Sequence, residues 1–164
     1  NNANNSTYIL SQLDKDVCKV NKVCFHVLPS TTNLKPRSAF LTLSNKSNPQ
    51  VATTYISIFK TLEGDKVFIN LLYVKDSVVQ FESKTLLMKV SESFRWKKIE
   101  VDFRTLLLKV SLSEEPTCPL KSLCPSSPST DFYENVEVYY VCLVNDKDIG
   151  NSELTDFYMT AVSF

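Results

Sequence analysis

The residues best suited to chemistry in this sequence are five cysteines: Cys18, Cys24, Cys118, Cys124 and Cys142. Four of them form two pairs with the same spacing, and neither pair has the two-residue gap that is typical of zinc sites. Disulfides, in contrast, persist in secreted proteins, where the environment is oxidising. We therefore predict that Cys18, Cys24, Cys118 and Cys124 form disulfides, and we expect no bound metal.

The pattern leaves the pairing of these cysteines open. In one extended strand Cys18 and Cys24 would lie roughly 20 Å apart, whereas a disulfide needs Cα atoms closer than about 7 Å. Either the chain turns between them or each pairs elsewhere, and Cys118 and Cys124 could bridge locally or to the first pair. Cys142 is expected to be a buried free thiol. The alternatives are an intermolecular disulfide, or a bridge that leaves a different cysteine unpaired.

Asn4, Asn5 and Asn45 each begin an N-x-Ser/Thr sequon, which predicts N-glycosylation. Sequons and cysteines together indicate a secreted or extracellular protein, either a mature chain or an ectodomain. The polar opening of the sequence fits this expectation, since it does not resemble a signal peptide. No apolar run approaches the ~18 residues that cross a bilayer, so we expect no membrane span.

Catalytic residues are hard to assemble from this chain. His26 is the only histidine, and it lies in an apolar block, where a structural role is more common than catalysis. Glu114 and Glu115 are adjacent carboxylates in a loop, where solvation explains them better than the acid–base pair of a glycosidase. We predict no catalytic residue, no cofactor and no enzymatic activity.

Two groups of residues are candidates for ligand contact. Arg95, Lys97 and Lys98 lie beside the single tryptophan, Trp96, and could bind an acidic glycan or protein. The alternative interpretation is the polar face of a strand that buries Trp96. Exposed tyrosines often contribute to protein interfaces, and Tyr133 and Tyr139 are the candidates here.

Glycine occurs only twice, at Gly64 and Gly150. Phosphate-binding loops and nucleophile elbows each need several glycines, so those enzyme classes are excluded. The net charge of zero argues against a nucleic-acid partner, which requires a basic surface. With so little glycine, the turns must use Pro, Asn, Asp and Ser, which favours longer connections over tight glycine hairpins.

Short blocks rich in Val, Ile, Thr, Tyr and Phe, separated by turn residues, predict strands. The blocks are 8–13, 17–28, 39–43, 51–61, 66–74, 77–82, 85–90, 94–103, 105–112, 135–144 and 154–164. We expect one all-β domain over 1–164, an antiparallel β-sandwich of about ten strands with little helix. Residues 113–133 contain four prolines and two cysteines and are expected to be a long loop.

Alternation within the blocks predicts which side chains are buried. Leu106, Leu108, Val110 and Leu112 share one face, with Lys109 and Ser111 opposite. Trp96 is expected to be buried in the middle of a strand. The apolar positions change parity at Lys97 and Lys98, which predicts a β-bulge.

Four consecutive segments, 67–73, 77–81, 94–101 and 106–110, resemble the strand order of laminin-G and concanavalin-like modules, including the tryptophan strand. The resemblance covers residues 67–112 and implies a jelly-roll or laminin-G-like sandwich. No calcium ligand or sugar-contact residue transfers from it.

These observations favour a non-enzymatic module that recognises an extracellular protein, in adhesion, receptor binding or immune modulation. A lectin-like glycan-binding domain is the alternative. A hydrolase would need converging carboxylates or a nucleophile beside His26, and a lipid carrier would need a large apolar cavity. Both are less favoured.

Overall fold

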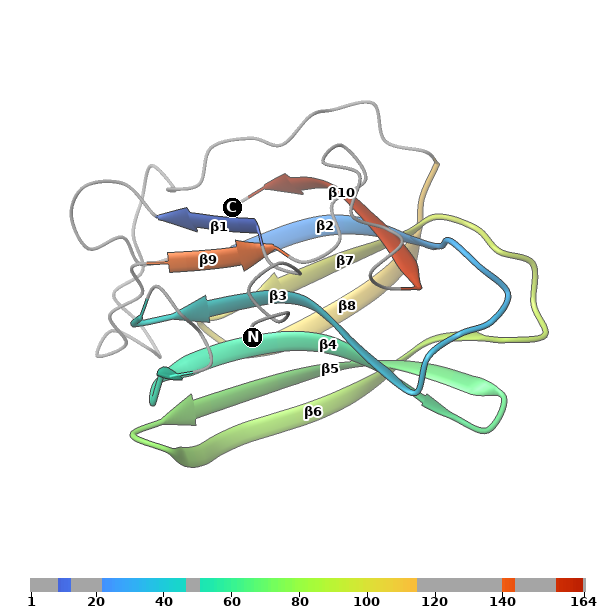
Figure 1. Cartoon of the computed structure of the whole chain (residues 1–164). Coiled ribbons are helices and arrows are strands. Elements are labelled where there is room, and N and C mark those ends of the chain that lie inside the picture. The colour runs from blue at the N-terminus through green and yellow to red at the C-terminus, as the bar shows by residue number, and fades with distance from the viewer. Residues whose placement is uncertain (1–8, 13–21, 47–50, 115–139, 144–155, 164) are drawn as a thin grey trace.

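The computed structural model describes residues 9–12, 22–46, 51–114, 140–143 and 156–163 (Figure 1). These residues contain ten β-strands and no α-helix. The strands are β1 (Ile9–Gln12), β2 (Lys22–Pro29), β3 (Arg37–Ser44), β4 (Tyr55–Glu63), β5 (Lys66–Lys75), β6 (Val78–Lys89), β7 (Lys97–Asp102), β8 (Leu107–Leu112), β9 (Tyr140–Leu143) and β10 (Phe157–Ser163).

The strands form two antiparallel sheets that pack as a sandwich, which confirms the predicted fold class. The first sheet has the order β1-β9-β3-β4-β5-β6 and the second β10-β2-β7-β8. For β1 and β9 only the backbone pairing is described. The other eight strands, four in each sheet, supply most of the buried side chains between the sheets, and Phe103 and Leu106 between β7 and β8 add to them.

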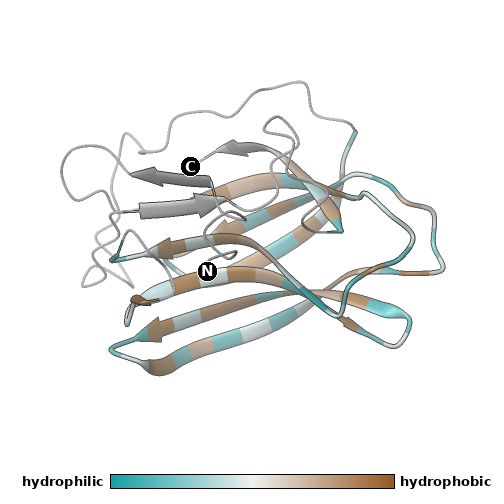
Figure 2. Ribbon diagram, viewed as in Figure 1, coloured by the Kyte–Doolittle hydropathy of each residue, from teal (hydrophilic) through white to brown (hydrophobic). Residues whose placement is uncertain are grey.

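The alternation in β2 shows why this sequence forms two layers. Val23, Phe25 and Val27 are buried, whereas Cys24 and His26 between them lie on the outer face. Burial alternates in the same way along β5, although its half-buried positions include the apolar Phe68 and Leu72. Figure 2 shows hydrophobic segments along the strands of both sheets. Side chains of a strand point to opposite faces in turn, so each such strand covers the core with one face only.

Aromatic side chains join the two sheets at the centre of the core. Phe40 of the first sheet lies 5.8 Å, centroid to centroid, from both Phe25 and Phe157 of the second. Its contact with Phe157 is edge-to-face, a favoured geometry for aromatic rings. All three rings are fully buried.

Trp96 is buried, as predicted, but it does not lie within a strand. β7 begins at Lys97, and its pairing with β2 and β8 is regular. The predicted bulge at Lys97 and Lys98 is therefore wrong. The parity changes because Trp96 belongs to the irregular segment before β7, where strand alternation does not apply.

Tight hairpins form despite the shortage of glycine. Gly64 occupies one of them with a φ of +62°, which glycine adopts without steric cost. Asp76 and Ser77 join β5 to β6 with φ values of 49° and 66°. Their backbone N–H groups donate to the Thr54 hydroxyl (3.2 Å) and the Thr53 carbonyl (2.8 Å). The expectation of longer connections is thus wrong here, because hydrogen bonds hold two non-glycine residues in the left-handed region.

The predicted strands 77–82 and 85–90 are one continuous strand, β6. The polar run Glu82, Ser83, Lys84 suggested a break, but it lies in an edge strand whose residues are largely exposed. The pairing register of β6 with β5 shifts twice, once near each end. Polar residues are tolerated at such an edge because water reaches them.

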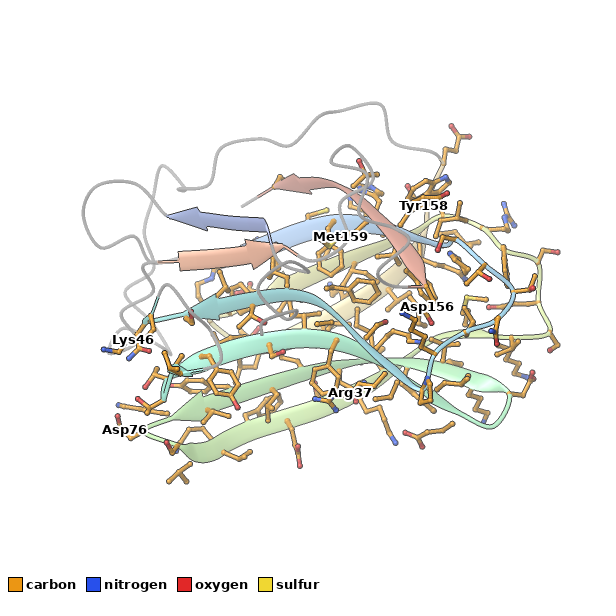
Figure 3. The ribbon with its side chains drawn as sticks, in the orientation of Figure 1. Arg37, Lys46, Asp76, Asp156, Tyr158 and Met159 are labelled. Carbon is orange, nitrogen blue, oxygen red and sulfur yellow. The ribbon has the colours of Figure 1, made fainter. Side chains whose placement is uncertain are left out.

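One ion pair lies inside the sandwich. The side chains of Lys60 in β4 and Asp156, just before β10, are both 0% exposed. Asp156 is labelled in Figure 3. The Asp156 carboxylate also accepts hydrogen bonds from the Lys35 backbone N–H (2.6 Å) and the Ser38 hydroxyl (2.8 Å). The Lys60 ammonium donates to Asp156 and to the Lys35 carbonyl oxygen. This network connects β10 of one sheet to β3 and β4 of the other.

Candidate functional site

The predicted basic group beside Trp96 does not form one patch. Lys97 and Lys98 are consecutive in β7, so their side chains point to opposite faces of the sheet. Lys97 lies 3.7 Å from a Glu92 carboxylate, and Lys98 lies 4.0 Å from that of Glu100. Arg95 precedes the strand and is exposed. Opposite charges thus accompany both lysines, which favours the interpretation of an ordinary polar surface.

Cys24 carries a free thiol on the outer face of β2, and the described residues contain no disulfide. Burial raises the pKa of this thiol, and the nearby Lys98 ammonium opposes that shift. The structure therefore does not show the predicted disulfide at Cys24, whose neighbours in the sheet are Ser163 of β10 and Glu100 of β7. Cys18, Cys118 and Cys124 lie outside the described residues, and their disulfides stay predictions.

Cys142 belongs to β9, where its backbone pairs with Leu10 of β1 and Thr42 of β3. Tyr133, Tyr139, Asn4 and Asn5 lie outside the described residues, as does all of the predicted 113–133 loop except its first two positions. Asn45 follows β3, and its side-chain Oδ1 is buried without a hydrogen-bond partner. Glycosylation at the three sequons and ligand contact by the two tyrosines stay predictions.

His26 lies on the outer face of β2, opposite Lys98 of β7 and Thr160 of β10. Its buried Nδ1 has no hydrogen-bond partner. Burial lowers the pKa of the imidazole, and the positive charge of Lys98 lowers it further. A hydrogen bond with the Thr160 backbone opposes this lowering of the pKa. A general base needs a side chain that orients it, and among the described residues no side chain bonds to Nδ1.

A different surface emerges on the outer face of β3, β4, β5 and β6. We call it the cation–aromatic surface and define it by Arg37, Phe59, Phe68, Asn70 and Lys84. The Arg37 guanidinium lies 3.8 Å from the centroid of the Phe59 ring, and the Lys84 ammonium lies 4.7 Å from that of Phe68. Both distances are well within the range of a cation–π interaction.

The sheet register brings these residues together. Phe59 of β4 pairs with Asn70 of β5, and Asn70 pairs with Lys84 of β6. Their sequence neighbours Ile58, Ile69 and Leu71 point into the core and are fully buried, so the cation–aromatic residues face outward. Figure 3 labels Arg37, at the start of β3, where the surface begins.

Asn70 and Lys84 are held by neighbouring groups. The Asn70 side-chain amide donates to the Thr61 hydroxyl (3.0 Å) and to the Phe59 carbonyl (3.3 Å). Lys84 also forms an ion pair with Glu63 at 2.7 Å. These contacts fix the side chains before any ligand arrives, which reduces the entropy lost on binding.

A hollow of about 320 Å³ opens on this surface, lined among others by Phe59, Asn70, Glu82 and Lys84. A smaller one, of about 170 Å³, lies on the other sheet between Lys22, Cys24, Asp102 and Lys109. Neither is a large apolar cavity, so the described residues give no support to the lipid-carrier alternative.

The sequence contained a weak indication of the cation–aromatic surface. Phe68 alternates with buried residues of β5, as an outward-facing side chain does. Phe59 has the outward parity in β4 but is only 8% exposed, and the Arg37 guanidinium lies over its ring. Nothing in the sequence placed Arg37 or Lys84 over them, because that depends on pairing between strands.

The described residues contain no group of three or more His, Cys, Asp or Glu side chains that could hold a metal ion. No helix among them is long and apolar enough to cross a membrane. Comparison with known proteins finds no matching family model and no matching curated protein.

Proposed function

We propose that this chain is a non-enzymatic binding module that recognises an extracellular protein through the cation–aromatic surface. The observation that carries the proposal is the pair of cation–aromatic contacts, Arg37 on Phe59 and Lys84 on Phe68. Arginine and aromatic side chains are enriched in protein interfaces and among the residues that contribute most to binding. The extracellular setting rests on the sequons and the cysteine content of the sequence.

Apolar side chains around these contacts support the same proposal. Leu86 is opposite Phe68 in the sheet and is 44% exposed. Val78 and Val79, at the start of β6, are more exposed still. A protein partner would remove this apolar area from water, whereas Glu63 and Glu82 would remain in a polar rim.

Glycan binding is the second candidate, and the 320 Å³ hollow favours it. A sugar can stack on an aromatic ring while carboxylate and amide groups bind its hydroxyls, and Phe59, Glu82 and Asn70 line the hollow. Phe59 is only 8% exposed, however, because Arg37 lies over its ring. In addition, the Asn70 N–H donors and the Lys84 ammonium already have protein partners. A surface whose polar groups are satisfied internally suits a protein better than a highly hydroxylated ligand.

The test uses two arginines that are both exposed, Arg37 on the surface and Arg95 before β7. The purified chain is screened against a panel of extracellular protein domains and against a glycan array. We expect a protein ligand whose affinity falls about thirtyfold or more in Arg37→Glu. The control, Arg95→Glu, makes the same charge change and should leave the affinity within about threefold.

Three results would contradict the proposal. Binding to glycans alone would favour the second candidate. An equal loss in both arginine variants would indicate an effect of net charge. A loss of affinity in Arg95→Glu alone would indicate that the ligand binds the basic residues before and at the start of β7.

A further inference from the structure

Strand β6 ends the first sheet, and no described strand pairs with its outer side (Figure 1). It is 12 residues long and contains no proline or glycine. Natural proteins usually protect such an edge with proline, inward-pointing charges, a very short strand, bulges or charged side chains such as lysine. The inward-facing positions Phe81, Ser83 and Thr85 carry no charge, so the protections that β6 has are a register shift near each end and the outward-facing charges Glu82 and Lys84.

The two register shifts in β6 define a regular segment between them. Phe81 through Leu86 pair one to one with β5, and the shifts lie just outside this segment. A second strand could therefore pair with at least five consecutive residues before a bulge interrupts the ladder.

The charges in this segment are arranged symmetrically. Glu82 and Lys84 flank Ser83, and their side chains point to the same outer face. When two copies of β6 run antiparallel with Ser83 opposite Ser83, each Glu82 faces Lys84 of the other copy. Centring the pair on Glu82 or on Lys84 places like charges opposite each other, which is unfavourable.

We propose that two copies of this chain associate through β6 in this antiparallel register, centred on Ser83. The first sheets of the two copies then form one continuous sheet. The backbone groups on the free side of β6 gain hydrogen-bond partners, as in other cases of strand addition. Two equivalent pairs of Glu82 with Lys84 fix the register.

The apolar residues of β6 add to this interface. In this register Leu86 of one copy lies opposite Gln80 of the other, and the exposed Val79 and Val78 come next along that strand. Strand β8 of the second sheet contacts β6 and also has no described neighbour on its outer side. Its Leu107 and Leu112 are more than half exposed, so the two edges together offer a self-complementary surface.

This inference goes beyond the proposed binding function and does not depend on it. A two-fold axis perpendicular to the sheet leaves the cation–aromatic surfaces of both copies on the same side. A dimer would therefore present two of them to a partner. The tests are distinguishable because Arg37 takes no part in the β6 pairing and its test measures ligand affinity, whereas the β6 variants are judged by the oligomeric state of the chain without any ligand.

The experiment measures the oligomeric state of the full chain by sedimentation equilibrium. A non-reducing gel run in parallel identifies any covalent dimer through Cys142. We expect a concentration-dependent, non-covalent dimer for the wild type. In Glu82→Lys and in Lys84→Glu the two symmetric attractions become repulsions, which should weaken association by on the order of tenfold to a hundredfold.

The decisive measurement is the sedimentation of an equimolar mixture of the two variants. Glu82→Lys has two lysines in the segment and Lys84→Glu has two glutamates, so a heterodimer restores two opposite-charge pairs. We expect each variant alone to sediment as a monomer and the equimolar mixture to sediment as a dimer. Lys84→Glu also loses its ion pair with Glu63, so circular dichroism confirms that each variant is folded.

Hydrogen exchange keeps the proposal testable if one variant does not fold. Amides in 81–85 of the wild type should be protected more at high than at low protein concentration. A wild type that stays monomeric, a dimer unaffected by Glu82→Lys, or a mixture that stays monomeric would each overturn the proposal. Exchange in 81–85 that is independent of concentration would do the same.

Discussion

The ion pair between Lys60 and Asp156 offers the sharpest test of what holds the two sheets together. Both side chains are completely buried, and burial lowers the pKa of Lys60, whereas its bond to Asp156 raises it. Asp156→Asn removes the negative charge and leaves a buried ammonium without its counter-charge. Breaking a buried pair in this way costs about 3–5 kcal/mol.

That loss is a large part of the 5–15 kcal/mol that typically separates folded from unfolded domains. For a chain of this size each kcal/mol lowers Tm by about 2–4 °C, so Asp156→Asn should lower Tm by roughly 10 °C. Urea unfolding followed by circular dichroism measures the free energy of unfolding directly.

Glu63→Gln is the matched control. The Lys84–Glu63 pair has a nitrogen–oxygen distance of 2.7 Å, but its side chains are 45% and 51% exposed. Such exposed pairs contribute less than about 1 kcal/mol. The two variants make the same chemical change, so their difference isolates the effect of burial.

A double-mutant cycle with Lys60→Met completes the test. The double variant Lys60→Met/Asp156→Asn removes both charges, and its asparagine oxygen can still accept from the Lys35 N–H or the Ser38 hydroxyl. It should be more stable than the sum of the single losses predicts, by on the order of 2 kcal/mol. Additive losses, or an Asp156→Asn no less stable than Glu63→Gln, would refute the reasoning.

Three further predictions concern single positions. Ser77→Gly should stabilise the chain by about 0.5–1 kcal/mol, because its φ of 66° disfavours residues with a Cβ; a lower Tm would contradict this. The lowered pKa of His26 means that the folded state resists protonation. Its contribution to stability is therefore complete above about pH 6.5, the unfolded pKa, and is lost as the pH falls through the folded value. Urea unfolding at pH 7 and pH 5 should show a smaller decrease for His26→Gln than for the wild type, and equal decreases would exclude this role. The Cys24 thiol should react with iodoacetamide more slowly in the native than in the unfolded protein, because burial raises its pKa; peptide mapping that finds Cys24 in a disulfide would disprove the free thiol.

The alternation of side chains in β4 predicts that Lys60 is buried, but it does not predict which residue Lys60 contacts. Ile56, Ile58 and Lys60 share one face of β4, so the pattern alone places this lysine toward the core. A lysine in that position needs a partner. Its partner, Asp156, is remote in the sequence, and only the packing of β10 across β4 brings the two together.

The laminin-G resemblance stays a prediction about family, since the comparisons offer no support for it. Its implied sandwich agrees with the structure at the level of fold class. The segment that carries the resemblance crosses between the sheets, because β5 and β6 belong to the first and β7 and β8 to the second.

Sequence alone determined the all-β class and the positions of most strands, because side-chain alternation and turn residues are local properties of the chain. It also assigned Trp96 and Leu108 to the core, whereas Leu112, predicted on the same face as Leu108, is 58% exposed. The tertiary structure decided which residues meet. The cation–aromatic surface draws on four strands, and the charge symmetry of β6 matters only because β6 is an edge. Both depend on strand order and register, which are set by long-range packing and are not encoded in any one segment.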